Sequence, residues 1–347
     1  MKFIFVIQGE GRGHFSQAIA LQQKLQANGH EIEQVFIGKS PFRTIPDYIS
    51  LFFKDKIQYF DSPNFLPTQR YTPLFSSIIY NLWHSKRFFT SIKFLKNAIN
   101  HSTADKVINF YEPLLGLTYK RYKIKKPMIC IAHQYAYLHK NYEFPQHFFV
   151  RKWLLKILTQ ISAFEAIRKI GLSFEPMSDL PDKHLYITPP LLRQEILNAQ
   201  NIVCNTYYLI YLLNDGFLQD IENQCLKTDI MVFSMQEKIS KNPCIHIRNM
   251  DNKNFINAII SAKAVVSTAG FETVAEAMFL QKPLLLIPVN FEQQTNAFLA
   301  KKSGNVLVAK KIDINEFEKF LQTTCPNDIF SQWVKQEENR ILDLILN

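Results

Sequence analysis

The 347-residue sequence has few cysteines, and their arrangement indicates no chemistry. Cys130, Cys204, Cys225, Cys244 and Cys325 are odd in number and scattered, and none belongs to a C-x-x-C motif or a Cys/His cluster. This pattern argues against a disulfide framework and a structural zinc site. A D-x-D triplet is also missing, so the sequence gives no sign of a metal requirement or of a bound cofactor.

Long apolar runs are missing as well. The first residues, MKFIFVIQGEGRGH, place only five apolar residues between Lys2 and Gln8, which is too short for a secretory signal peptide. No run approaches the roughly 18–20 residues that span a bilayer. We therefore expect a cytoplasmic protein. Peripheral attachment to the inner face of the cell membrane is compatible with this location.

Repeats and low-complexity segments are absent too, and the remaining composition is that of a globular protein. Hydrophobic residues make up 47% of the chain and charged residues 20%. Single cores stop growing at roughly 250–300 residues, so this length favours two domains.

The net charge of +10 is unevenly distributed. Residues 1–190 carry 25 Lys and Arg against 13 Asp and Glu, whereas residues 191–347 carry 15 against 17. A basic, aromatic first part fits anionic lipid headgroups, nucleic acid or an acidic substrate, and it equally fits a solvated basic face. Nucleic-acid binding is disfavoured because the chain lacks an aromatic-basic RNA motif.

The order of the predicted elements indicates two α/β domains. Apolar runs predict strands at Lys2–Gln8 and at residues 33–38, 105–111 and 127–132, with helices at 16–26, 78–100 and 147–171. A proline-rich, acidic stretch at 173–190 is the expected hinge. A second series follows, with strands at 207–213, 229–234, 244–248, 264–267 and 283–288 and helices from 217 and at 254–262, 271–279 and 293–303.

We thus expect two doubly wound, Rossmann-like parallel-sheet domains that face a central cleft. Their predicted bounds are 1–190 and 191–327, and an amphipathic C-terminal helix at 328–347 is expected to pack back across the hinge.

The first motif is G-E-G-R-G-H at residues 9–14, between a strand and a helix. Glycines there let backbone N–H groups approach a ligand, and a helix N-terminus favours negative charge. A dinucleotide fingerprint is disfavoured, because the sixth-position glycine and an acid at the end of the second strand are both missing. His14 is a candidate general base for an acceptor hydroxyl, and a capping or packing histidine is the alternative.

The second motif is A-V-V-S-T-A-G-F-E-T-V-A-E at residues 264–276. A strand that runs into small residues and hydroxyls at a helix N-terminus is the arrangement that binds a diphosphate. Glu276 lies about two turns into that helix, where its carboxylate suits a ribose diol. Glu292 and Gln293 open the next helix with paired polar side chains that suit sugar hydroxyls.

These residues resemble a known family. Residues 268–276 match the H-C-G-W-N-S-x-x-E donor signature of GT-B glycosyltransferases that use UDP-sugars, and E-Q-x-x-N-A at 292–297 matches the end of that signature. The glycine loop is similar to that of the lipid II-forming N-acetylglucosaminyltransferases. Thr268 departs from the usual histidine and Glu272 from the usual asparagine, which leaves the donor's identity open.

The resemblance implies a GT-B fold and inverting transfer of a sugar to an acceptor hydroxyl, with His14 as the base. It assigns the diphosphate to residues 268–273, the ribose to Glu276, and the sugar to Glu292 and Gln293. The donor-binding residues that follow are Gly11, Gly13, Thr268, Ala269, Gly270, Phe271, Glu272, Thr273, Glu276, Glu292 and Gln293.

Two further candidates follow predicted strands of the first domain. Glu112 could orient His14 or stabilise its charge, and His133 could act as the base or bind the acceptor. Ligands bind at the carboxyl ends of strands in open α/β sheets, which favours both residues, although each could instead be a buried, satisfied polar group.

Residues 78–96 and 147–161 mix Trp, Phe and Leu with Lys and Arg. They predict either interfacial helices that hold a lipid acceptor at an anionic membrane, or core-facing helices with basic rims.

The leading function is a hexosyltransferase whose acceptor is a lipid or another hydrophobic molecule. The alternatives are a nucleotide-sugar hydrolase or epimerase on the same fold, and a non-catalytic nucleotide-sugar-binding protein.

Overall fold

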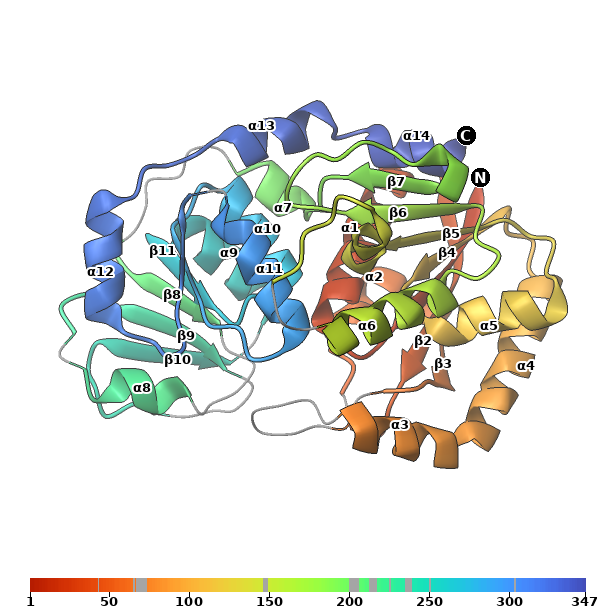
Figure 1. The fold of residues 1–347 in the computed structure, drawn as a ribbon, viewed down its shortest axis with the longest axis horizontal. Coiled ribbons are helices and arrows are strands. Elements are labelled where there is room, and N and C mark those ends of the chain that lie inside the picture. Colours follow the sequence, from red (N-terminus) through yellow and green to blue (C-terminus); the bar gives the residue numbers. More distant parts are fainter. Residues whose placement is uncertain are drawn as a thin grey trace. The chain divides into compact units, whose positions relative to one another are not determined.

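The computed structural model describes residues 1–42, 44–64, 66, 74–145, 149–199, 206–211, 217–224, 226–234, 239–249, 251–302 and 304–347. These residues form two compact units. The first consists of residues 1–193 and 337–347, and the second of residues 194–336. Each unit is built around one parallel sheet (Figure 1).

The first sheet has seven strands in the order β3-β2-β1-β4-β5-β6-β7. Its strands are β1 (Lys2–Gln8), β2 (Glu31–Lys39), β3 (Ile57–Asp61), β4 (Lys106–Phe110), β5 (Met128–Ala132), β6 (Arg168–Leu172) and β7 (Leu185–Thr188). Its helices are α1 (Arg12–Ala27), α2 (Tyr48–Phe53), η1 (Lys54–Lys56), α3 (Leu74–Trp83), α4 (Ser85–His101), α5 (Pro113–Tyr122), η2 (His133–Leu138), α6 (Phe149–Ser162), η3 (Pro181–Lys183) and α14 (Arg340–Leu346).

The central strand β1 is buried on both faces. Ile4 and Val6 pack into a core that α4 and α5 also line, whereas the ring of Phe5 contacts Phe53 of α2 at a centroid distance of 6.2 Å. Helices on both sides of a parallel sheet explain why β1 is an unbroken apolar run rather than an alternating one.

The register brings the carboxyl ends of the central strands level. Gln8 of β1 pairs with Gly38 of β2, and Ile7 pairs with Phe110 of β4. Segments that follow these strands therefore gather at one edge of the sheet, which is where ligands bind in open α/β folds.

The second sheet has six strands in the order β10-β9-β8-β11-β12-β13. Its strands are β8 (Tyr208–Tyr211), β9 (Ile230–Ser234), β10 (Ile245–Asn249), β11 (Ala264–Ser267), β12 (Leu284–Leu286) and β13 (Val306–Val308). Its helices are α7 (Gln194–Leu197), α8 (Leu218–Glu222), α9 (Asn252–Ser261), α10 (Phe271–Phe279), α11 (Phe291–Lys301), α12 (Ile314–Thr323) and α13 (Ile329–Gln336).

The expected fold class, two Rossmann-like parallel-sheet domains, is confirmed. The strands expected at Lys2–Gln8 and Ala264–Ser267 and the helix at Phe271–Phe279 have the predicted bounds. The strand expected at 207–213 is seen as Tyr208–Tyr211, and its predicted end lies outside the described residues.

Two expectations for the first unit are wrong. The helix predicted at 147–171 ends at Ser162, and its last residues form β6 instead. The stretch 173–190, expected as a hinge, contains β7, which pairs with β6 inside the first sheet. Proline and acidic residues at 175–182 lie in the crossover connection between these two parallel strands, within the first unit, rather than in a linker between units.

The C-terminal segment forms two helices instead of the single one expected. α13 packs against α10 in the second unit. α14 belongs to the first unit, where Lys106 Nζ donates to the carbonyl oxygens of Ile345 (2.7 Å) and Leu346 (3.0 Å). Within the described ranges, every helix is too short or too polar to cross a bilayer.

Candidate active site

The glycine loop follows β1 and lies against the end of β2. Gly9 N–H donates to Gly38 O at 2.8 Å, and a Cβ atom on Gly9 would collide with that carbonyl oxygen. Glycine at this position therefore lets two strand ends touch. Gly11 is the N-cap of α1, and Gly13 lies in the first turn of that helix.

His14 lies in the first turn of α1 and is buried. Its ring stacks on Tyr111, with a centroid distance of 5.6 Å and an interplanar angle of 24°. Tyr111 follows β4 directly and has a φ of 64°, in the left-handed region. Such a conformation is uncommon for a bulky residue and is often found at functional sites.

Glu112 is completely buried and caps α5. Its carboxyl group accepts hydrogen bonds from Ser62 Oγ (2.8 Å) and from Leu114 N–H (3.0 Å). A Cβ atom on Gly38 would collide with the same carboxyl group, so Glu112 packs directly against the end of β2. Burial raises the pKa of Glu112 to about 8, although these two hydrogen bonds act in the opposite direction.

His133 opens η2, directly after β5, and is also buried. Its ring meets the edge of Tyr137 at a centroid distance of 5.9 Å. His14, Glu112 and His133 thus follow three adjacent strands, β1, β4 and β5. The sheet brings them to the same edge, which the positions of the predicted strands anticipated.

In the second unit, the predicted diphosphate segment forms the turn between β11 and α10. Ala269 has a left-handed φ of 63°, and Gly270 is the N-cap of α10. Asn296 of α11 holds this turn, because its Nδ2 donates to Ala269 O at 3.1 Å. Within the part of the chain that the structure describes, Ser267 Oγ and Asn296 Oδ1 are buried without a hydrogen-bond partner.

The first two turns of α10 carry the other predicted donor residues. Phe271, Glu272, Thr273 and Glu276 are all buried there. Thr268, in the turn before them, is buried too. The segment 268–276 thus puts two hydroxyl groups and two carboxylates at one helix end, where N–H groups and the helix dipole favour an anion.

The N-terminus of α11 is held by reciprocal capping bonds. Asn290 Oδ1 accepts from Gln293 N–H (2.9 Å), and Gln293 Oε1 accepts from Val289 N–H (3.0 Å). Glu292 lies in the same first turn. Because β11 and β12 are adjacent and parallel, the N-termini of α10 and α11 lie at the same edge of the second sheet.

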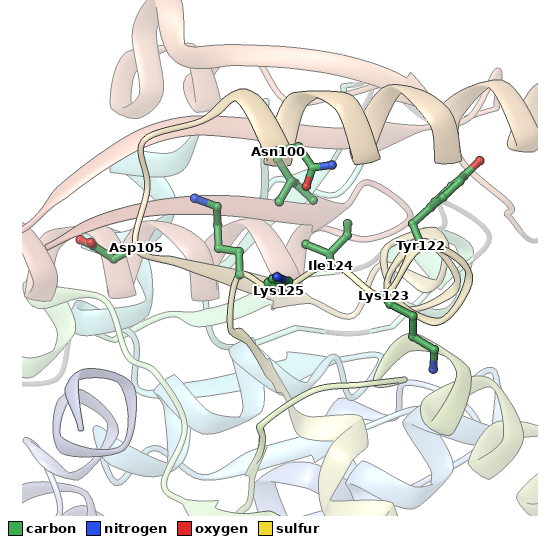
Figure 2. A pocket seen from close by; sticks show the side chains of 8 residues that line it. Asn100, Asp105, Tyr122, Lys123, Ile124 and Lys125 are labelled. Atoms are coloured by element: carbon green, nitrogen blue, oxygen red, sulfur yellow. The ribbon is translucent and has the colours of Figure 1, made fainter.

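A separate hollow of about 560 Å³ lies on the first unit (Figure 2). It is lined by the end of α4 and by the turn between α5 and β5, and it contains none of the predicted residues. Lys126 Nζ donates to Ser102 O at 3.3 Å, and Lys123 pairs with Glu165 at 3.1 Å. Because it lies before the amino ends of β4 and β5, this hollow is remote from the edge that carries His14.

Sequence reasoning missed Tyr111, Ser62 and Asn296. Tyr111 ends the strand predicted at 105–111 and Asn296 stands within the E-Q-x-x-N-A motif, but no role was assigned to either residue. The roles of these residues depend on backbone geometry and on contacts between distant segments of the chain. Within the described residues, no group of three or more His, Cys, Asp or Glu side chains could hold a metal ion.

Two of three comparisons place this chain among known proteins. The family described as Glycosyl transferase family 1 matches residues 1–325. Curated proteins give no match to the sequence.

Solved structures match over nearly the whole chain. The spinosyn forosaminyltransferase SpnP has a TM-score of 0.63 at 13% identity and covers 100% of both chains. Medicago truncatula UGT71G1 complexed with UDP-glucose has a TM-score of 0.61 at 15% identity, over 97% of this chain and 92% of the other. LpCGTa in complex with UDP has a TM-score of 0.60 at 13% identity, over 93% and 90%. At these identities the likeness shows the fold.

Proposed function

The chain belongs to glycosyl transferase family 1 and is a glycosyltransferase with the GT-B fold, and from this premise we propose that it moves a sugar from a UDP-sugar to an acceptor hydroxyl with inversion. The observation that supports this most strongly is the turn at Ala269, which opens α10 beside buried polar groups. No metal or cofactor takes part in this proposal, because the helix N-terminus supplies the positive potential for the diphosphate.

The donor binds along α10 and α11. N–H groups of the first turn of α10, with the hydroxyl groups of Thr268 and Thr273, bind the diphosphate, and the buried Ser267 Oγ adds a further donor. Glu276 accepts from the ribose hydroxyls. Glu292 and Gln293 read the sugar, and since Gln293 Oε1 already accepts from Val289 N–H, its Nε2 is the group that donates to a sugar hydroxyl.

The choice of UDP rests on the resemblance of residues 268–276 to the UDP-sugar signature and on the UDP and UDP-glucose complexes among the structures of the same fold. Glu272 places a carboxylate in the first turn of α10, beside the site for the diphosphate. This charge opposes an anionic ligand. We therefore expect weaker binding of UDP here than in a site with asparagine at that position.

The transfer is a single displacement. His14 removes the proton of the acceptor hydroxyl, the acceptor oxygen forms a bond to the anomeric carbon, and the bond from that carbon to UDP breaks. The negative charge that develops on the leaving phosphate is stabilised by the N-terminus of α10. His133 binds the acceptor in this scheme, and Glu112 supports the end of β2, against which the glycine loop before His14 lies.

The acceptor is a lipid at an anionic membrane surface. This proposal is supported by α6 and α3, whose apolar side chains face solvent: Phe149 is 81% exposed and Trp83 is 84% exposed. Trp153 and Leu82 are exposed as well, on the same two helices. Lys152 and Lys156 flank the exposed residues of α6, with Nζ atoms 4.8 and 5.5 Å from the ring centre of Phe144. Exposed aromatic residues beside cations are typical of helices that lie in a membrane interface.

The experiment is a panel of UDP-, GDP-, dTDP- and CMP-sugars, scored by thermal shift and by nucleotide release. Each sugar is tested alone, and with phosphatidylcholine/phosphatidylglycerol vesicles that contain diacylglycerol as a hydroxyl acceptor. We expect release from a UDP-sugar that rises several-fold with these vesicles. Glu276→Ala should lower release at least tenfold, whereas Glu316→Ala, an exposed carboxylate on α12, should not change it.

Other outcomes identify the alternatives. Release that proceeds equally well without any acceptor would indicate a nucleotide-sugar hydrolase, and a converted sugar nucleotide without release would indicate an epimerase. A thermal shift without turnover would indicate a non-catalytic binding protein.

A further inference from the structure

The backbone of Tyr111 is held in the left-handed region by the residues on either side of it. Asn109 Oδ1 accepts from Glu112 N–H at 2.8 Å, and Asn109 Nδ2 donates to Glu112 O at 3.2 Å. The Glu112 side chain in turn caps α5. A left-handed conformation is unfavourable for a non-glycine residue of this size, so the surroundings of Tyr111 must impose it.

The consequence of this conformation is the position of the Tyr111 ring. Its face lies almost parallel to the imidazole of His14. Its hydroxyl group is hydrogen-bonded to Thr159 Oγ1 of α6 at 2.9 Å, and its edge meets Tyr135 at a centroid distance of 5.8 Å. The ring is therefore fixed at its face, its edge and its hydroxyl end.

Such a ring acts on a histidine in two ways. It fixes the plane of the imidazole, so that the ring nitrogens point in defined directions, and its electron-rich face attracts the positive charge that the imidazole gains when it accepts a proton. A histidine base is commonly oriented by a carboxylate. Here the buried carboxyl group after β4, Glu112, is engaged by Ser62 and Leu114 N–H.

We propose that Tyr111 is the positioning residue of His14, with its face oriented by the left-handed backbone and its hydroxyl group anchored to α6 through Thr159. The proposal rests on the proposed function, since it assumes that His14 is the general base. It adds that the base is oriented by an aromatic face.

The test compares Tyr111→Phe, which keeps the ring, with Tyr111→Leu, which keeps an apolar side chain but removes the aromatic face. The first readout needs no substrate. In proton NMR spectra, the carbon-bound ring protons of His14, assigned with His14→Gln, should move downfield in Tyr111→Leu as the ring current is lost, and should stay near their wild-type positions in Tyr111→Phe.

The second readout is the kinetics of transfer. Tyr111→Leu should lower kcat about tenfold or more while the KM for the donor changes less than about twofold, because only the base is misplaced. Tyr111→Phe should recover most of the wild-type kcat. Tyr122→Leu, which replaces a tyrosine at the remote hollow, is the matched control and should leave kcat unchanged.

The outcomes separate the two proposals. Wild-type kcat in Tyr111→Leu, together with an inactive His14→Gln, would overturn the positioning role alone. A fully active His14→Gln, or a wild-type protein inactive with every donor, would overturn the proposed function and this inference with it. Should Tyr111→Leu fail to fold, Tyr111→Met provides the same comparison.

Discussion

Glu112 is an ionisable residue whose side chain is completely buried. Its pKa is raised to about 8 from an ordinary value of 4.5. Between these two pH values, the folded protein therefore keeps a proton on Glu112 that the unfolded chain releases. The free energy of unfolding must therefore fall as the pH rises from about 4.5 to about 8, and this contribution becomes constant above that range. At about 1.4 kcal/mol per pKa unit, the loss amounts to a few kcal/mol.

Replacement of this carboxyl by an amide tests the argument. Glu112→Gln has no proton to lose, and its amide can keep both the bond from Leu114 N–H and the contact with Ser62. We expect its unfolding free energy, measured by urea titration, to fall less than that of the wild type between pH 5 and pH 8. Parallel curves for the two proteins would show that Glu112 is ionised without cost in the folded state.

Asn296 holds the turn between β11 and α10, where we propose that the diphosphate binds. Asn296→Asp removes the N–H donor to Ala269 O and adds a negative charge, so the affinity for UDP should fall at least tenfold in isothermal titration calorimetry. Gln294→Glu adds the same charge to the same helix without touching that carbonyl oxygen. If both variants lose affinity equally, the charge and not the hydrogen bond is responsible.

At the scale of elements, α6 has two sides of different chemistry. Its inner side carries Thr159 and Ser162, and its exposed side carries Phe149 and Trp153. The double variant Phe149→Ser/Trp153→Ser should bind phosphatidylglycerol-containing vesicles about tenfold less than the wild type in co-sedimentation. Leu51→Ser changes an equally exposed apolar residue on α2 and should have no effect. Undiminished binding of the double variant would exclude α6 as the contact.

The elements also show how far the sequence determines the fold. Buried central strands such as β1 are unbroken apolar runs with a glycine stop, and these were predicted with accurate bounds. β6 begins with Arg168 and Lys169, and β7 is a short strand in a proline-rich stretch. The basic start of β6 and the short length of β7 led to the wrong predictions, since the pairing of such strands depends on neighbours that local sequence does not reveal.

The candidate site likewise has a part that the sequence predicts and a part that it does not. The glycine loop and the segment 264–276 could be predicted, because small residues between a strand and a helix are a local pattern. The roles of Tyr111 and Asn296 could not, since they arise from a left-handed backbone and from a hydrogen bond between segments 27 residues apart.

At the scale of the whole molecule, the chain returns to its first unit after α13. α14 ends there against two cations: Lys106 Nζ, which donates to Ile345 O, and Arg168, which donates to Leu344 O at 2.7 Å. Cations at a helix C-terminus satisfy its last carbonyl groups and its dipole.

Removal of residues 337–347 should therefore weaken the first unit. It removes the acceptors of Lys106 and the buried side chains of Ile341, Leu342 and Ile345, whose burial contributes about 1.5–3 kcal/mol each. Hydrogen exchange should become faster in β4 and β6, and the strands of the second unit serve as the internal control. Unchanged protection of β4 and β6 would show that α14 contributes nothing to the stability of this sheet.

The proposed function requires that Glu276 binds the donor and that His14 activates the acceptor. The most direct measurement is the rate of UDP release from a UDP-sugar, with diacylglycerol-containing vesicles, by the wild type, Glu276→Ala and His14→Gln. We predict release by the wild type, with a loss of at least tenfold in each variant: through the KM for the donor in Glu276→Ala and through kcat in His14→Gln. Release that is unaffected by both substitutions would contradict the proposed function.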